Sequence, residues 1–260
     1  MSLPPQQPTT RIATHSSDDI FVRGQSLCHD LIGKLSFTEM MVFQMLGRLP
    51  STAERTMIDA CLVTLMEHGL TPSTLTARLI YSSAPEAMQG AVAAGLLGVG
   101  SVFVGAMEGC AALLERIVNA TDGEKAEAER IARQHRAART PIPGFGHHLH
   151  KPDDPRSLRL FELARGQGVA GAHITAVQTL SQAIDAAYGK HITINATGAI
   201  AAVLGDCGVP APIMRGFALV SRCAGLVGHI REEQQHPAMR AIWEAAERAV
   251  PHQGPAADPG

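Results

Sequence analysis

The most informative stretch of the sequence is Pro143-Gly144-Phe145-Gly146-His147-His148-Leu149-His150-Lys151, followed by Asp154-Pro155-Arg156. Two prolines and two glycines fall within residues 140–146, which excludes a helix interior and predicts a loop. The glycines expose backbone N–H and C=O groups, which suit an adenine or a phosphate. His147 follows at once and can act as an acid, a base or a carbonyl polariser. Arg156 can hold a carboxylate through two parallel hydrogen bonds. This loop motif, residues 143–156, therefore predicts a ligand-binding site.

The three histidines of the loop motif have a second interpretation, which is a metal site. His147, His148 and His150 are side chains of a kind that zinc accepts as ligands. Adjacent histidine side chains diverge on most backbones, however, and no cysteine or pair of carboxylates completes a set of ligands. We therefore expect no metal.

On both sides of the loop motif the sequence has the pattern of helices. Ser36 with Glu39, and Ser51 with Glu54, have the spacing of capping boxes. Aromatic residues make up only 4% of the chain, which favours closely packed helices over a β-sandwich. The only β-like run is residues 192–195. The expected fold class is all-α, with helices that start near residues 36, 51 and 71 and others over residues 87–107, 122–139, 157–167, 172–188, 198–204, 215–234 and 239–250.

One segment has the length of a membrane span. No charged residue occurs between Glu86 and Glu108, but this stretch contains five glycines and has no counterpart elsewhere in the chain. We expect a buried helix over residues 87–107 that crosses the protein centre or a subunit interface, and no membrane as a partner.

Composition bears on partners and on compartment. The chain has 260 residues and a formal net charge of −2, so it lacks the basic excess that nucleic-acid binding needs. Its five cysteines show no Cys-x-x-Cys spacing, which favours reduced core thiols over disulfides or zinc ligands. Prolines and polar residues stand where a signal peptide has its apolar core. We expect a cytoplasmic protein with a small-molecule ligand.

Two cationic side chains outside the loop motif are candidates for anion binding. His68 lies at a predicted helix end, before Gly69, where its simplest role is a helix C-cap. Arg222 lies in an apolar helix, where burial is costly unless the guanidinium meets a ligand anion or an internal salt bridge. Gly98-x-Gly100 has Phe103 in place of the third glycine and no preceding strand, so a dinucleotide-binding loop is rejected.

Taken in order, these motifs resemble the citrate synthase superfamily over residues 31–234. The matching segments are Gly47-Arg48-Leu49-Pro50, Glu67-His68-Gly69 with Ser73-Thr74 and Ala77-Arg78, the loop motif, and Arg222 with Gly225 and His229. The resemblance implies a citrate synthase-like multi-helical fold with a large and a small domain, active as a homodimer. We expect the large domain at residues 20–105 and 209–250, the small domain at 106–208, a flexible arm at 1–19 and a flexible tail at 251–260.

The resemblance also implies roles for individual residues. His68, His147, Arg156 and Arg222 match positions that hold the carboxylates and the carbonyl of oxaloacetate or a citryl group. Two arginines can neutralise a dicarboxylate, and a histidine beside the carbonyl stabilises charge that develops on oxygen. The implied substrate is a coenzyme A thioester, without a metal, and the backbone that contacts it matches Pro143, Gly144, Phe145 and Gly146.

Three departures from the family pattern refine the expected activity. Phe103 stands where citrate synthases have a catalytic histidine, as it does in the citryl-CoA lyase branch, which includes the lyase module of ATP-citrate lyase. Thr197 stands where both branches have a catalytic aspartate, and its hydroxyl can only donate or accept a hydrogen bond. His148 stands where the family usually has arginine.

The expected reaction is a retro-Claisen cleavage of citryl-CoA, or of a similar 3-hydroxy-3-carboxyacyl-CoA, to acetyl-CoA and oxaloacetate. In it Thr197, through a bound water, or Glu108 or His148 takes over the role of the aspartate. Three alternatives stay open. These are a related reaction on a different acyl-CoA or 2-oxoacid, a citrate synthase-like condensation, and a catalytically impaired protein that binds coenzyme A or a dicarboxylate.

Overall fold

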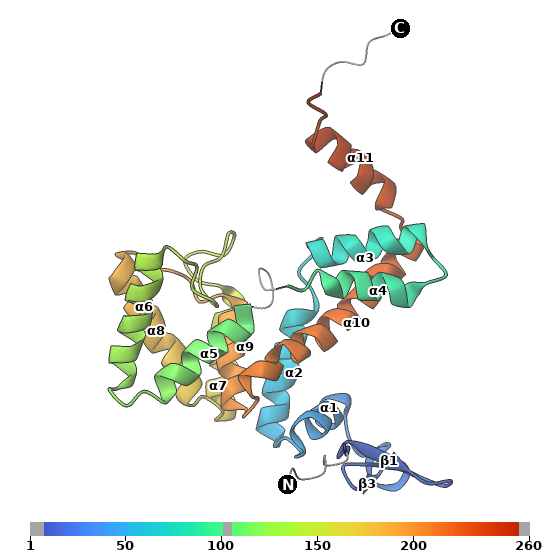
Figure 1. The fold of residues 1–260 in the computed structure, drawn as a ribbon, viewed down its shortest axis with the longest axis horizontal. Coiled ribbons are helices and arrows are strands. Elements are labelled where there is room, and N and C mark those ends of the chain that lie inside the picture. The colour runs from blue at the N-terminus through green and yellow to red at the C-terminus, as the bar shows by residue number, and fades with distance from the viewer. Residues whose placement is uncertain (1–7, 101–105, 255–260) are drawn as a thin grey trace, which may run out of the picture. The chain divides into compact units, whose positions relative to one another are not determined.

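The structure is a computed structural model, and it describes residues 8–100 and 106–254. Helices dominate it (Figure 1), and the predicted all-α fold class is confirmed. The helices are α1 (Phe37–Leu46), α2 (Thr52–Met66), α3 (Pro72–Ser83), α4 (Met88–Leu97), α5 (Ala106–Val118), α6 (Glu124–Ala138), α7 (Pro155–Gln167), α8 (Ala172–Tyr188), α9 (Ala196–Asp206), α10 (Met214–Gln235) and α11 (Met239–Ala249), with the short turns η1 (Leu27–Leu31) and η2 (Ala211–Ile213).

The predicted helix starts rest on local side-chain chemistry that the structure reproduces. Ser36 caps α1, since its side chain accepts from the Glu39 N–H while Glu39 accepts from the Ser36 N–H at 2.7 Å. Ser51 and Glu54 form the same reciprocal pair before α2. Two orphan amides are satisfied at each start, and this fixes where the helix begins.

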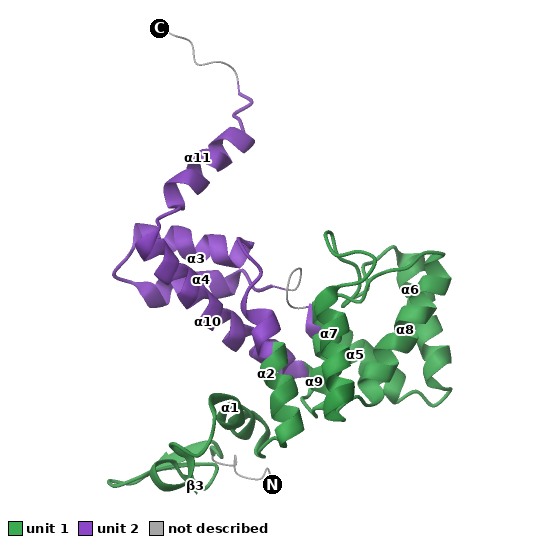
Figure 2. Cartoon of the chain, turned by 180° about the vertical axis from the view of Figure 1, so that it is seen from behind, with its two compact units in different colours: residues 1–61, 110–211 green, residues 62–109, 212–260 purple. Residues whose placement is uncertain are grey.

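The chain divides into two compact units (Figure 2). Residues 1–61 and 110–211 form unit 1, and residues 62–109 and 212–260 form unit 2. The large domain expected at residues 20–105 and 209–250 and the small domain expected at residues 106–208 stay predictions.

Helix α9 is the buried centre of the second segment of unit 1. It packs against α7 and α8, and α8 packs in turn against α6. Nearly all of α9 is buried, including every residue from Gly198 to Gly205. Small residues allow this close packing. A Cβ on Gly205, for example, would come within 2.7 Å of the His173 ring.

Unit 2 is built around α10, which packs against α3 and α4. Gly95 of the uncharged segment serves this packing, since a Cβ there would lie 2.8 Å from Leu226 Cδ1 and 2.9 Å from the Ser73 carbonyl oxygen. The prediction of one continuous helix over residues 87–107 was wrong. Helix α4 ends at Leu97, where the Gly98 N–H turns back to the Gly95 and Leu96 carbonyls, and α5 begins at Ala106.

A small antiparallel sheet near the N-terminus was not predicted from the sequence. Strands β1 (Ala13–His15), β2 (Ile20–Val22) and β3 (Gln25–Ser26) pair in that order. Strand β1 lies within residues 1–19, which we expected to be a flexible arm. Asp19 closes the turn, because its carboxylate accepts from the Ile20 N–H and the Ser26 hydroxyl. The Ser26 hydrogen bond is the main cause that lowers the pKa of Asp19 to about 2. At residues 192–195, the predicted β-like run, Ile194 makes a single bridge with Phe145.

Helix α10 concerns the expectation that no membrane is a partner. Residues Ala211–Gln235, which include α10, are long and apolar enough to cross a membrane by length and composition, since they contain an 18-residue window with a mean hydropathy of 1.2. Yet α10 carries the buried charges Arg222 and Glu233. The absence of a membrane partner stays a prediction.

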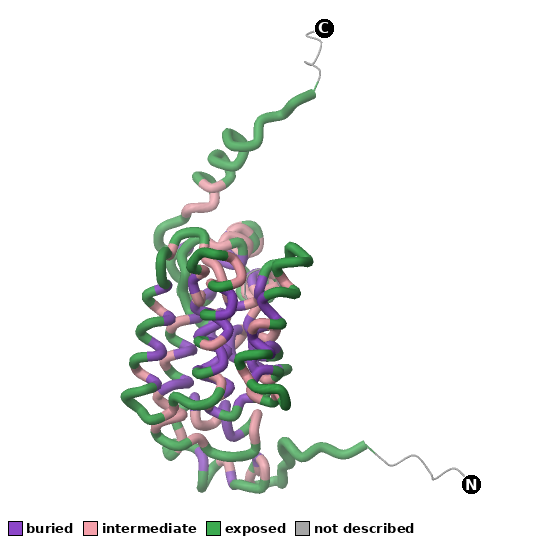
Figure 3. Tube along the Cα trace, turned by 90° about the vertical axis from the view of Figure 1, so that its left-hand side faces the viewer, coloured by how far each residue is buried: buried purple, intermediate pink, exposed green. Residues whose placement is uncertain are grey.

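Helix α11 has no buried residue, and Figure 3 shows it as exposed along nearly its whole length.

Candidate functional site

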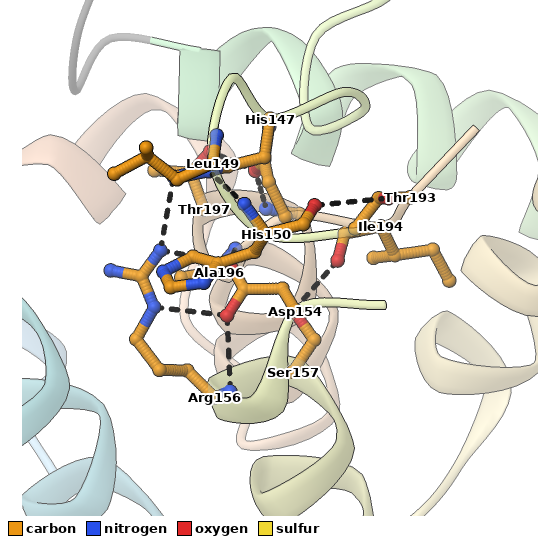
Figure 4. A network of polar contacts seen from close by, with 12 residues as sticks. His147, Leu149, His150, Asp154, Arg156, Ser157, Thr193, Ile194, Ala196 and Thr197 are labelled. Atoms are coloured by element: carbon orange, nitrogen blue, oxygen red, sulfur yellow. Dashed lines mark hydrogen bonds and ion pairs between the residues drawn. The ribbon is translucent and has the colours of Figure 1, made fainter. Parts of the chain in front are cut away.

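The start of the loop motif is held against the segment that leads into α9 (Figure 4). The Gly146 N–H donates to the Thr193 carbonyl at 2.7 Å, and the Asn195 N–H donates to the Gly144 carbonyl at 3.0 Å. These backbone bonds flank the bridge between Phe145 and Ile194. The predicted loop is therefore fixed in position by a partner segment about fifty residues away in sequence.

Two glycines make this contact possible. Gly144 has a φ of +86°, and a Cβ there would lie 2.5 Å from Cys110 Sγ and 2.9 Å from Gly198 Cα. A Cβ on Gly198 would in turn collide with the Gly144 carbonyl oxygen. The loop backbone thus lies directly on the first turn of α9, and a side chain at either position would push the two apart.

His147 is held in one orientation by the turn that follows it. Its Nδ1 accepts from the backbone N–H groups of Leu149, at 3.1 Å, and His150, at 3.0 Å. A neutral imidazole that accepts at Nδ1 carries its proton on Nε2. Burial, together with positive charge on His150, Arg156 and His148, lowers the pKa of His147, against an opposing effect of Asp154. At neutral pH His147 is therefore a hydrogen-bond donor through Nε2.

Arg156 is oriented by a buried carboxylate. Asp154, which is fully buried, caps α7 and accepts from the Arg156 N–H at 3.0 Å, Nε at 3.0 Å and Nη2 at 2.8 Å, and from the Ala196 N–H at 3.1 Å. Burial alone would raise the pKa of Asp154, but the hydrogen bonds and charge of Arg156 lower it on balance. Asp154 is part of the loop motif but was not among the predicted site residues, although an aspartate before Pro155 has the signature of a helix N-cap.

The donors of His147 and Arg156 lie side by side. His147 Nε2 and Arg156 Nη2 are 3.4 Å apart. With the proton of His147 on Nε2, both nitrogens are donors, so they do not hydrogen-bond to each other. An oxygen atom between them would accept from both. This is the arrangement that stabilises negative charge on a carbonyl, carboxylate or alkoxide oxygen.

Thr197 joins the same network through Asn195. The Asn195 side chain donates to the Gly146 carbonyl at 3.0 Å and accepts from the Thr197 hydroxyl at 2.6 Å and the Gly198 N–H at 3.1 Å. Thr197 is thus two hydrogen bonds away from the residue that precedes His147, with its proton committed to Asn195. Asn195 was not among the predicted site residues, although it too has the signature of an N-cap before a helix.

The second half of the loop motif is also tied down. The Ser157 hydroxyl donates to the Ile194 carbonyl at 2.8 Å, and the Thr193 hydroxyl donates to the Pro152 carbonyl. His191 bridges Asp185, at 2.6 Å, and Asp153, at 3.2 Å, and these hydrogen bonds raise its pKa, the one with Asp185 most. His148 and His150 stack on the His147 ring, with centroid distances of 4.7 and 4.4 Å.

Two further predicted residues lie in unit 2. His68 is exposed, in the turn after α2, and its N–H donates to Glu67 Oε1 at 2.8 Å. Arg222 on α10 is only 8% exposed, and its Nη1 has no hydrogen-bond partner among residues 8–100 and 106–254. Burial lowers the pKa of Arg222, while the charge of Glu67 opposes this. A buried guanidinium nitrogen without a partner favours a ligand anion over an internal salt bridge.

A cavity lies next to the loop motif within unit 1. It has a volume of about 400 Å³ and combines arginine side chains with an apolar wall; its lining residues are Arg136, Arg139, Thr140, Pro141, Ile142, Phe145, Tyr188 and Ile192. Positive charge beside an apolar wall suits a molecule with a flat ring and phosphate groups. The remaining predicted residue, Phe103, lies outside the described residues.

The chain is similar to known proteins in sequence and in fold. Residues 11–243 match the family model "Citrate synthase, C-terminal domain". The citryl-CoA lyase of Hydrogenobacter thermophilus superposes with a TM-score of 0.87 at 31% identity, covering 97% of each chain. The ATP citrate lyase of Methanothrix soehngenii, solved with citrate and coenzyme A, superposes with a TM-score of 0.76 at 19% identity over 98% of this chain and 43% of that one. The citrate/2-methylcitrate synthase of Bacillus subtilis is 30% identical over 76% of this chain and 53% of its own length, so the chain spans about half of this curated relative.

Proposed function

The chain belongs to the citrate synthase family, whose members are enzymes that act on coenzyme A thioesters, and from this premise we propose that it is a citryl-CoA lyase. It cleaves citryl-CoA, or a similar 3-hydroxy-3-carboxyacyl-CoA, to acetyl-CoA and oxaloacetate. The observation that carries the proposal is the pair of donors on His147 Nε2 and Arg156 Nη2, 3.4 Å apart. They suit the oxygen of the tertiary hydroxyl, on which negative charge must develop before the carbon–carbon bond breaks.

The proposed chemistry begins at that hydroxyl. His147 cannot take up its proton at Nε2, which already carries one, so the proton passes to water while the two donors stabilise the alkoxide. The alkoxide collapses to the ketone of oxaloacetate, the carbon–carbon bond breaks, and its electron pair forms the thioester enolate. A proton from water then completes acetyl-CoA. Overall one proton leaves to solvent and one returns.

Thr197 has a restricted part in the last step. Its proton is committed to Asn195, but its oxygen can still accept from a water and thereby orient it toward the enolate. Glu108 is a weaker candidate for this role because it is paired with Arg215 at 2.6 Å. His148 is stacked on His147 at the loop. The loss of a positioned acid costs on the order of 10²–10⁴ in rate, so we expect slow turnover.

Coenzyme A binds, in this proposal, at residues 143–146 and in the adjoining cavity. The adenine lies on the apolar wall formed by Ile142, Phe145 and Ile192, and phosphate groups meet Arg136 and Arg139. Arg222 holds a substrate carboxylate with its unpaired Nη1, assisted by His68. We further propose a cytoplasmic homodimer that needs no metal.

Condensation is the second candidate because sequence relatives such as the Bacillus subtilis protein are named citrate synthases. Two assays on the same preparation separate the candidates. One follows oxaloacetate released from citryl-CoA, and the other follows free coenzyme A released from acetyl-CoA and oxaloacetate. The lyase proposal requires cleavage above the buffer rate. Condensation alone would refute it, and binding of coenzyme A without either activity would leave an impaired binding protein.

A further inference from the structure

Helix α10 carries one histidine, His229, which lies inside a cluster of charges in unit 2. Arg78 on α3 is buried, and its Nη1 lies 2.8 Å from a carboxylate oxygen of Glu233, which is also buried. Arg78 also pairs with Glu232. The same guanidinium faces His229, with Nε at 3.2 Å and Nη2 at 3.1 Å from Nδ1. None of these residues has a role in the reaction described above.

The arginine fixes which nitrogen of His229 carries the proton. Guanidinium nitrogens can only donate, so His229 Nδ1 must accept, and the ring proton lies on Nε2. His229 Nε2 is 2.7 Å from Glu67 Oε2. The ring is only 13% exposed. Arg78 therefore holds His229 in the tautomer whose Nε2–H donates a hydrogen bond to Glu67.

Glu67 in turn organises the turn that bears His68. Its Oε1 accepts from the backbone N–H groups of both His68 and Gly69. Partial burial favours protonation of Glu67, but the hydrogen bond from Gly69 and the interaction with His229 outweigh this and lower its pKa. The carboxylate thus stays charged at neutral pH, close enough to oppose the lowering of the Arg222 pKa.

The spacing along α10 confirms that one face of the helix serves this turn. The Ser221 hydroxyl donates to the Leu62 carbonyl near the end of α2. A Cβ on Gly225 would collide with the Met66 carbonyl oxygen. Residues 221, 225 and 229 recur every four positions, so they form one stripe that runs along the end of α2 to Glu67. Arg222 lies next to this stripe.

We propose that His229 is a positioning residue. It holds the Glu67 carboxylate, which fixes the His68–Gly69 turn near Arg222, whose Nη1 has no hydrogen-bond partner among the described residues, so that both are ready to receive a substrate carboxylate. The inference rests on the proposed function, because it gives His229 a role in the binding of a substrate carboxylate at the proposed site. Coenzyme A binding at residues 143–146 does not depend on it.

Amide hydrogen exchange, followed by mass spectrometry on a peptide that contains residues 66–70, tests the geometry without any activity. In His229→Leu the exchange of the His68 and Gly69 amides should accelerate about 10-fold, the effect of losing a hydrogen bond to a charged group. His229→Gln keeps an N–H donor near Nε2 and should restore at least a third of the protection. His173→Leu is the matched control, because it removes a comparable histidine–aspartate contact of 3.0 Å with Asp206.

Kinetics of the same variants test the role. In His229→Leu the KM for citryl-CoA should rise about 10-fold with kcat changed less than 3-fold, while the affinity for free coenzyme A stays within 2-fold. Unchanged amide exchange in folded His229→Leu overturns the inference, and so does faster exchange without a change in KM. If His229→Leu does not fold, Glu67→Ala, at a half-exposed side chain, must show the same acceleration. A wild type without turnover refutes the proposed function, and the exchange result then decides the positioning geometry alone.

Discussion

Asp154→Asn is the perturbation whose effect follows most directly from the contacts. The carboxylate accepts four hydrogen bonds, three of them from Arg156, and is fully buried. An asparagine keeps one acceptor oxygen but turns an NH2 group toward donors on the other side. About two charge-assisted hydrogen bonds are lost, at roughly 1.5–3 kcal/mol each. We predict that the free energy of unfolding falls by about 3–5 kcal/mol at pH 7, as for other broken buried ion pairs.

Urea unfolding followed by helical circular dichroism measures this change. The matched control is Glu129→Gln, which removes an exposed ion pair with Arg133 and should cost less than about 0.5 kcal/mol. Because the pKa of Asp154 is lowered in the folded state, its stabilisation is present above its unfolded pKa of about 3.9 and is lost as the pH falls through the folded value. The difference between wild type and variant should therefore shrink below about pH 4. A difference under about 1 kcal/mol at pH 7 refutes the reasoning.

Three more predictions concern the site. Gly144→Ala should destabilise the protein by about 1–3 kcal/mol and weaken coenzyme A binding, because the new Cβ would meet Cys110 Sγ at 2.5 Å on a backbone with positive φ. Thermal unfolding with and without coenzyme A measures both effects. A thermal shift by coenzyme A that is the same as in the wild type counts against the proposed contact of coenzyme A with this loop. Thr197→Asp should raise the rate of citryl-CoA cleavage by about 10²-fold, measured as oxaloacetate release, since a carboxylate would return where the family has its acid; unchanged turnover points to a different substrate. As the pH is lowered, kcat/KM should decrease only below pH 6.5, because the pKa of His147 is lowered and its neutral form is the donor. A decrease that already begins above pH 7 contradicts the assigned tautomer.

Local chemistry explains how much of the fold the sequence predicted. The capping boxes at Ser36 and Ser51 involve residues three apart, and α8 was predicted with the bounds that the structure has. The sheet of β1–β3 was missed because its strands are two or three residues long, too short for an alternating pattern. The uncharged segment was predicted as one helix because composition does not reveal that α4 ends at Leu97, before Gly98.

The structure brings some of the predicted site residues together, while their roles toward a substrate stay predictions. His147 and Arg156 lie side by side, and Thr197 is joined to the same loop through Asn195. The supports for them are distant in sequence. Asp154 reaches Ala196 across 42 residues, and His229 reaches Glu67 across 162. No local spacing predicts such contacts, although the N-cap signature of Asp154 and Asn195 gave a signal that these side chains face backbone donors.

The most direct test of the central claim compares citryl-CoA cleavage by the wild type and by His147→Ala. Initial rates of oxaloacetate release over a range of citryl-CoA concentrations give kcat and KM separately. If the Nε2–H of His147 stabilises the alkoxide, kcat should fall about 10²–10³-fold with a smaller change in KM. A His147→Ala enzyme that matches the wild type, or a wild type no faster than buffer, would contradict the claim.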